Sequence, residues 1–266
     1  MSDAQPRSRR PLALVALLTL SALTGLGVLA TGVLAPWSWQ ARLCVAIAGI
    51  GLLGNVPFVG RHWSSSARWA DRVRTRDGAT VIAYDRVPAY AAAWALGWTT
   101  LVAVLGTSFG VAGGHTGMSL LLGLPFVLLF GLPLVDTLLA LLRGAEVVAD
   151  GERLTVRSWH TETSIAWDDV ERVTLDLGPR GMVIAVAGYT AGTTWRGRRL
   201  QHVLPGRVPM APGRVDVDSR AVEPHSPWLL IVLQDWAADA AARGQIGTPE
   251  AERRLRQGRD MATGSY

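Results

Sequence analysis

The chain contains four long apolar stretches between residues 11 and 142, and none of comparable length after Arg143. Lipid offers backbone amides no hydrogen-bond partner, so a segment that crosses about 30 Å of hydrocarbon must be a helix of about 20 mainly apolar residues. The stretches that meet this requirement lie at about 11–34, 43–59, 88–109 and 118–142. The sequence therefore predicts a four-span transmembrane domain over residues 11–142, followed by a water-soluble domain.

The arginines indicate how these spans are oriented, because short cytoplasmic loops are enriched in positive charge. Arginines precede the first span, fill the connection 61–86 and follow the fourth span at Arg143, whereas the other two connections hold one arginine between them. We therefore expect the tail 1–10, the connection 61–86 and the soluble domain on the cytoplasmic side. The predicted protein is a multi-pass protein of the plasma membrane, with both termini in the cytoplasm.

Composition excludes several kinds of active site. All 26 of the Lys and Arg residues are arginine, so there is no side-chain amine for a lysine-dependent phosphate loop, a Schiff base or a pyridoxal site. Cys44 is the single cysteine, and the five histidines are scattered without metal-ligand spacing. We therefore expect no catalytic residue, no cofactor, no metal and no enzymatic activity. Arginine without lysine, together with abundant alanine, indicates a GC-rich bacterial genome.

Asp136 is the one acidic residue inside the predicted spans. An unpaired carboxylate is costly in hydrocarbon, so intramembrane acids are functional candidates. Asp136 precedes Leu142 by six residues, or about 9 Å along a helix, and can therefore reach the inner interface. Two interpretations stay open: a structural pair with a loop arginine, and a proton or ion site in a small transporter or channel subunit.

The connection 61–86 can be interpreted in two ways. At about 100° per residue, Arg61, Arg68 and Arg72 share one face of a helix, with Arg76 nearby, and a basic amphipathic helix of this kind suits the lipid headgroup plane. The alternative is a solvated loop that obeys the positive-inside rule. Nucleic-acid binding is not expected, because the membrane already accounts for the charge and no recognition motif is present.

Beyond Arg143 the pattern changes from helical to alternating, which predicts strands. The predicted strands lie at 146–150, 154–158, 161–167, 171–177 and 182–186, with two more, interrupted by glycine and proline, near 194–203 and 214–218. Earlier in the chain, the turn Asp77-Gly78 before residues 79–84 predicts a strand that could join the same sheet. Ser226-Pro227 opens an amphipathic helix that Gly244 can terminate. The tail 245–266 is expected to be a solvated appendage containing a last short helix.

Two segments of the soluble domain carry a family resemblance: LTVRS (154–158) and IAWDDVERV (165–173). In this order they resemble the bacterial pleckstrin-homology-like family, in which a Leu-x-Val-Arg strand leads into an Ile-Pro-Trp-x-x-Ile-like signature. Here Ala166 and Val170 stand where proline and isoleucine are common. The alternation itself predicts that Ile165 and Trp167 point to the core and that Val170 and Val173 return to it after a turn. The resemblance covers residues 145–244 and implies a binding or scaffolding module, although the acidic turn 150–152 argues against inositol-lipid recognition.

The predicted fold class is therefore α+β: a four-helix transmembrane bundle followed by a pleckstrin-homology-like antiparallel β domain with a C-terminal helix. The predicted divisions are 1–10, 11–142, 145–244 and 245–266. We expect a non-enzymatic membrane protein whose module binds another protein or a neighbouring membrane component. The candidate headgroup contacts are Arg61, Arg68, Arg72 and Arg76, and Asp136 is the candidate polar site within the membrane. A transporter or channel subunit that uses Asp136 is the alternative. Arg196, Arg198 and Arg199 form a second basic group that faces either headgroups or water.

Overall fold

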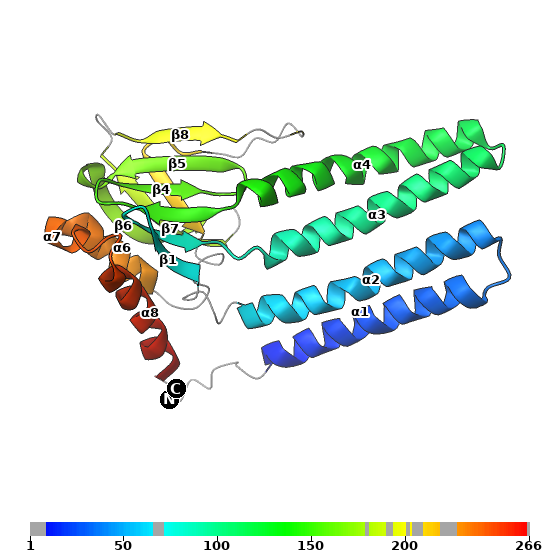
Figure 1. Ribbon diagram of the computed structural model, residues 1–266, viewed down its shortest axis with the longest axis horizontal. Helices are drawn as coiled ribbons and strands as arrows, with labels where there is room; N and C mark the ends of the chain where they lie inside the picture. Colours follow the sequence, from blue (N-terminus) through cyan, green and yellow to red (C-terminus); the bar gives the residue numbers. More distant parts are fainter. Residues whose placement is uncertain are drawn as a thin grey trace. The chain divides into compact units, whose positions relative to one another are not determined.

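The computed structural model describes residues 9–65, 72–178, 181–189, 194–200, 203, 210–218 and 228–264. These residues form an α+β structure with long helices and two antiparallel sheets (Figure 1). The chain divides into two compact units. The first unit comprises Met1–Trp63 and Val87–Leu138, and the second comprises Ser64–Arg86 and Leu139–Tyr266.

The first unit is helical. It contains α1 (Arg9–Leu34), α2 (Trp39–Ser65), α3 (Val87–Ala112) and most of α4 (Thr116–Arg143). Within the described residues, three segments are long and apolar enough to cross a membrane: Trp39–Phe58, Val87–Ala112 and Thr116–Arg143. The described part of α1 adds the shorter apolar segment Thr19–Leu34. The second, third and fourth predicted spans therefore correspond to helices of sufficient length and apolarity.

Glycines allow the backbones of α1 and α2 to approach closely. A Cβ added to Gly32 would lie 2.6 Å from the backbone nitrogen of Ala46, and one added to Gly49 would lie 2.6 Å from that of Leu29. At the end of α1, Arg42 donates hydrogen bonds from Nη2 to the Val33 carbonyl (2.5 Å) and from Nε to the Gly32 carbonyl (3.4 Å). Its positive charge thus caps the negative end of the α1 dipole.

The larger sheet of the second unit, sheet A, has six antiparallel strands in the order β1-β2-β3-β4-β5-β8. The strands are β1 (Val73–Arg76), β2 (Ala79–Ala83), β3 (Glu146–Ala149), β4 (Arg153–Arg157), β5 (Thr161–Ala166) and β8 (Arg196–Arg199). The β1–β2 hairpin comes from the connection between α2 and α3, and β2 pairs with β3, which follows α4. The predicted strand after Asp77-Gly78 and its place in the sheet are confirmed.

The helical alternative for the basic connection is wrong for its last part, because Val73–Arg76 is a strand. Asp77 and Gly78 both have positive φ, 54° and 74°, as a tight hairpin turn requires. This turn folds residues 73–76 back onto 79–82, and the ladder then satisfies their backbone groups. Helical spacing of the arginines was a weaker constraint than this pairing.

The smaller sheet, sheet B, has the order β6-β7-β9 and also is antiparallel. Its strands are β6 (Val170–Gly178), β7 (Gly181–Gly188) and β9 (Arg214–Asp218), and a 3₁₀ turn, η2 (Trp167–Asp169), leads into β6. The described residues of this unit also form three helices: α6 (Trp228–Ala238), α7 (Ala240–Arg243) and α8 (Pro249–Gly264). α6 lies against β6, where Gln234 Nε2 donates to the Val173 carbonyl at 2.9 Å.

The signature segment supplies the centre of the core, as its alternation predicted. Ile165, Trp167, Val170 and Val173 are all buried, and η2 occupies the predicted turn. The Trp167 indole N–H donates to the Asp150 carbonyl at 2.7 Å, and its ring meets that of Trp236 edge to face, with centroids 6.2 Å apart. The β3–β4 turn, η2 and α6 are thereby joined around one side chain.

The C-terminal segment is part of this core, which corrects the prediction of a solvated appendage. Ala251 and Leu255 on α8 are fully buried, and the Trp228 indole N–H donates to the Arg254 carbonyl at 2.8 Å. Among the described side chains of α8, Ala251 and Leu255 are the apolar ones that make this contact. The helix is otherwise mainly polar, so its sequence gave little indication of burial. The structure thus groups the β1–β2 hairpin and α8 with the two sheets, whereas the predicted divisions placed them in the transmembrane domain and in a separate tail.

Candidate functional site

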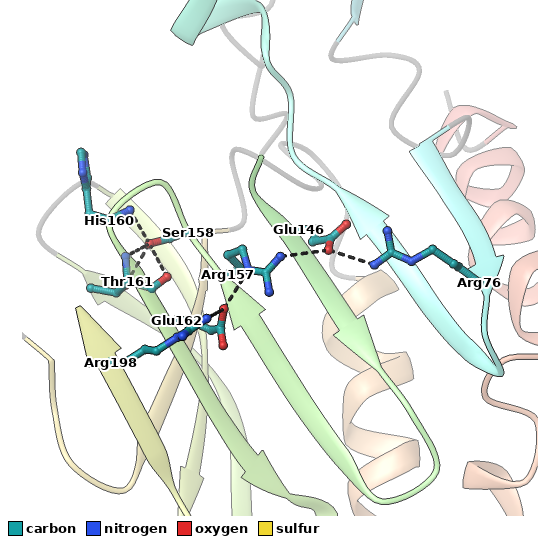
Figure 2. A network of polar contacts seen from close by, with 8 residues as sticks. All are labelled: Arg76, Glu146, Arg157, Ser158, His160, Thr161, Glu162 and Arg198. Carbon is teal, nitrogen blue, oxygen red and sulfur yellow. Dashed lines mark hydrogen bonds and ion pairs between the residues drawn. The ribbon is translucent and has the colours of Figure 1, made fainter. Parts of the chain in front are cut away.

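A row of alternating charges crosses sheet A (Figure 2). We call Glu146, Arg157, Glu162 and Arg198 the charged row, because each stands opposite the next on adjacent strands. Arg157 lies 3.7 Å from Glu146 (Nη1 to Oε1) and 2.8 Å from Glu162 (Nε to Oε2). Arg198 Nη2 lies 3.1 Å from Glu162 Oε2. From β1, Arg76 Nη2 reaches Glu146 Oε1 at 3.0 Å.

The β4–β5 turn fixes the register of this row. The Ser158 N–H donates to the Thr161 carbonyl at 2.8 Å, while the Ser158 hydroxyl accepts from the backbone N–H groups of Thr161 (3.1 Å) and His160 (3.3 Å). These bonds close a compact turn that places Arg157 opposite Glu162 (Figure 2). Opposite charges across a strand pair contribute about 0.2–1 kcal/mol each, so the row stabilises the sheet modestly.

One end of the charged row, Glu146, lies close in sequence and in strand register to the two chain segments that connect the second unit to the helices. Glu146 follows the last residue of α4, Arg143, by three positions, and it stands opposite Ala83, which precedes Arg86 by three. Three residues span at most about 11 Å. The row therefore begins close to the chain segments that lead to α3 and from α4, and it extends across the strands from there.

Glu162 is held as a carboxylate. Partial burial raises its pKa, but hydrogen bonds from Arg157 and Arg198 and the charges of both guanidinium groups outweigh that effect, so the pKa of Glu162 is lowered overall. A lowered folded-state pKa means that ionised Glu162 stabilises the folded state. This contribution is complete above the unfolded pKa and is lost as the pH falls through the folded pKa.

Replacing Glu162 by glutamine should therefore destabilise the second unit near neutral pH by about 1 kcal/mol or less, as expected for a partly exposed ion pair. The difference in unfolding free energy between the wild type and Glu162→Gln should stay constant above about pH 5. It should shrink below the ordinary glutamate pKa of about 4.3, where the wild-type side chain also becomes neutral. Urea unfolding of both proteins across this pH range measures it, and a difference that persists unchanged into acid would contradict the assignment.

Of the four predicted headgroup arginines, Arg72 and Arg76 have side chains that the structure describes. Arg61 lies in α2, where its side chain is outside the described residues, and Arg68 lies outside them altogether. Arg72 immediately precedes β1 and is half-buried; burial lowers its pKa, and the charge of Asp85 acts in the opposite direction. Arg76 pairs with Glu146. Of these two described side chains, that of Arg76 contacts the charged row.

Asp136 lies in α4, half-buried, and takes part in a polar interaction. The structural and the functional interpretation of Asp136 both stay predictions. Within the described residues, no three histidine, cysteine, aspartate or glutamate side chains gather closely enough to hold a metal ion.

Sequence reasoning had singled out Arg198, but not the other three residues of the charged row. One signal was available, because Arg157 and Glu162 stand symmetrically about the Ser158–Thr161 turn and carry opposite charges. The link from Glu162 to β8 had no local signal, since β8 lies beyond the whole β6–β7 hairpin in sequence. Comparison with known protein families, with curated proteins and with solved structures finds no match to this chain.

Proposed function

We propose that this chain is a non-enzymatic plasma-membrane protein of four spans that holds a pleckstrin-homology-like binding or scaffolding module at the cytoplasmic surface. The observation that carries the proposal is the pairing of β2 with β3. β2 precedes α3 and β3 follows α4, so one sheet joins both ends of this helical pair. A folded sheet of this kind lies on one side of a bilayer, and the arginines of the connection favour the cytoplasm as that side.

The fourth span in this proposal is α1. It has 26 residues, about 39 Å at 1.5 Å per residue, which exceeds the hydrocarbon thickness. Its close contact with α2 through Gly32 and Gly49 suits helices that pack in lipid, where small residues permit close approach. With α1 as a span, the N-terminus also lies in the cytoplasm.

The pleckstrin-homology-like assignment is supported by the order of the elements. Two antiparallel sheets are followed by α6, whose Leu229, Leu233 and Trp236 are buried in the core. The signature residues Ile165 and Trp167 are buried beside them. These buried residues stabilise the fold, so a binding partner would contact other, exposed residues.

The surface that we propose for recognition is the charged row together with Arg76. Arg76, Arg157 and Arg198 surround two glutamates, so positive charge is in excess, and the side chain of Arg198 is 67% exposed. An excess of guanidinium groups favours anionic partners, because guanidinium binds carboxylate or phosphate oxygens in a bidentate manner. The proposed partner is a protein that presents an acidic segment to the module beside the membrane.

The test uses the full chain in nanodiscs as bait for a cytosolic extract of its own cells, with Arg198→Glu as the variant. Arg253→Glu on α8 is the matched control, since its arginine is 68% exposed and also pairs with a glutamate. We expect bound protein to be retained by the wild type and by Arg253→Glu and to be lost with Arg198→Glu. A well-folded wild-type bait that retains nothing, or equal retention by both variants, would contradict the proposal. The transporter or channel alternative through Asp136 stays a prediction.

A further inference from the structure

The core-facing side of the β6–β7 hairpin continues past the end of the core. Val173, Ile184 and Val186 on this side are buried. Farther along the hairpin, on the same side, Leu175 is 47% exposed, Leu177 is 78% exposed and Met182 is 36% exposed. We call these three exposed residues the hairpin tip.

The hairpin tip is one contiguous apolar surface. Leu177 stands opposite Met182, and Leu175 is on the same side of β6, two positions before Leu177. The other side of β6 is polar here, because Asp176 accepts a hydrogen bond from Arg214 Nη1 at 2.8 Å. Single exposed apolar residues are common on protein surfaces. An adjacent group of them at the end of a hairpin instead indicates a contact surface.

Backbone pairing places the hairpin tip near Tyr84, in the chain segment that precedes α3. The Asp218 N–H donates to the Tyr84 hydroxyl at 3.3 Å, and Asp218 stands opposite Val183, the residue next to Met182. Strand spacing and residue length then put the tip within about 15 Å of that hydroxyl. Tyr84 precedes Arg86 by two residues, and its N–H donates to the Ala145 carbonyl at 3.0 Å, one rung beyond the Ala83–Glu146 pair.

We propose that the hairpin tip inserts into the boundary between headgroups and acyl chains of the membrane that the helices span. This inference rests on the proposed membrane topology. The occupant is bilayer lipid, because the tip and the charged row lie beside the same two chain connections, which under that topology meet the bilayer surface. Exposed apolar side chains beside a bilayer surface suit the boundary between headgroups and acyl chains. The module is then attached to the membrane through an apolar contact as well as through its helices.

Site-specific labelling of the full chain tests this inference. In a Cys44→Ala background, one cysteine at a time is introduced as Leu177→Cys, Tyr189→Cys or Leu121→Cys and labelled with an environment-sensitive fluorophore. Tyr189 is 53% exposed and follows the opposite end of β7, so it serves as the matched control. Leu121, on α4, is 70% exposed and reports on the span itself. The proteins are placed in nanodiscs of phosphatidylcholine and phosphatidylglycerol, with or without lipids that carry a nitroxide near the top of the acyl chain.

We expect the nitroxide lipids to cause a loss of fluorescence at positions 177 and 121 and no loss at position 189. Quenching at 121 with none at 177 overturns the inference and leaves the proposed topology intact. A blue-shifted but unquenched label at 177 also overturns it, in favour of a protein or a second copy as the occupant. An unquenched label at 121 overturns the proposed topology, and the inference falls with it.

Discussion

Replacing Trp167 by alanine should destabilise the second unit by about 3–5 kcal/mol, the usual cost of removing a large aromatic side chain from a core. Trp167 is 1% exposed and contacts Trp236 edge to face. Its indole N–H is also the donor to the Asp150 carbonyl. Since the free energy of unfolding of a single domain is only about 5–15 kcal/mol, this loss is a large part of the total stability. Hydrogen exchange of the β4, β5 and α6 amides in the full chain measures the loss.

Two comparison variants separate the causes. Trp167→Phe keeps an aromatic ring but leaves the Asp150 carbonyl without this donor, so we expect a smaller loss of about 1–3 kcal/mol. Trp37→Ala removes the same side chain from an exposed position between α1 and α2 and should leave exchange in the second unit unchanged. If Trp167→Ala had no more effect than Trp37→Ala, the central role of Trp167 in the core would be refuted.

Replacing Gly247 by alanine should release α8 from the β1–β2 hairpin. Gly247 has a φ of 76°, and a Cβ there would lie 1.9 Å from the Gly78 carbonyl oxygen, which belongs to the hairpin turn. The Gly247 N–H also donates to the Thr80 hydroxyl at 2.9 Å. Left-handed strain costs roughly 1–2 kcal/mol and overpacking roughly 1–3 kcal/mol, so we expect a total loss of about 3 kcal/mol.

Gly213→Ala is the matched control for this variant. Gly213 has a φ of 74°, close to that of Gly247, but a Cβ there would meet nothing within 4 Å. It should therefore show the conformational strain alone, about 1–2 kcal/mol. Limited proteolysis of the full chain reads out the difference, with early cleavage in α8 expected for Gly247→Ala only. Equal cleavage of the two variants would mean that the contact with Gly78 is unimportant.

Local patterns were sufficient for much of the fold. The apolar lengths located α2, α3 and α4, and alternation located the strands of the second unit other than β1, including β2 after its Asp-Gly turn. The inward positions of Ile165, Trp167, Val170 and Val173 also followed from alternation and a turn. Each of these features depends on the periodicity of a short segment, which the sequence carries directly.

Features that depend on distant pairing could not be predicted in the same way. The arginine spacing of β1 is compatible with a basic helix, and only its pairing with β2 shows that it is a strand. Arg76 contacts Glu146 because β2 pairs with β3, although α3 and α4 separate these strands in sequence. Likewise, the burial of Ala251 and Leu255 requires a surface made by strands from other parts of the chain. The candidate site combines four strands, so its residues became evident only from the register of the sheet.

The place of the β1–β2 hairpin in the sequence also sets the order of assembly during synthesis. This hairpin leaves the ribosome before α3 and α4, but its partner β3 follows both helices. The edge of β2 that pairs with β3 therefore stays unpaired until the α3–α4 pair and β3 have been synthesised. Long-range strand pairing of this kind is slow, and unpaired strand edges are prone to aggregation. The charges at Arg74 and Arg76 on the neighbouring strand help to keep such an edge soluble. Completion of sheet A thus becomes a late step that follows synthesis of the α3–α4 pair.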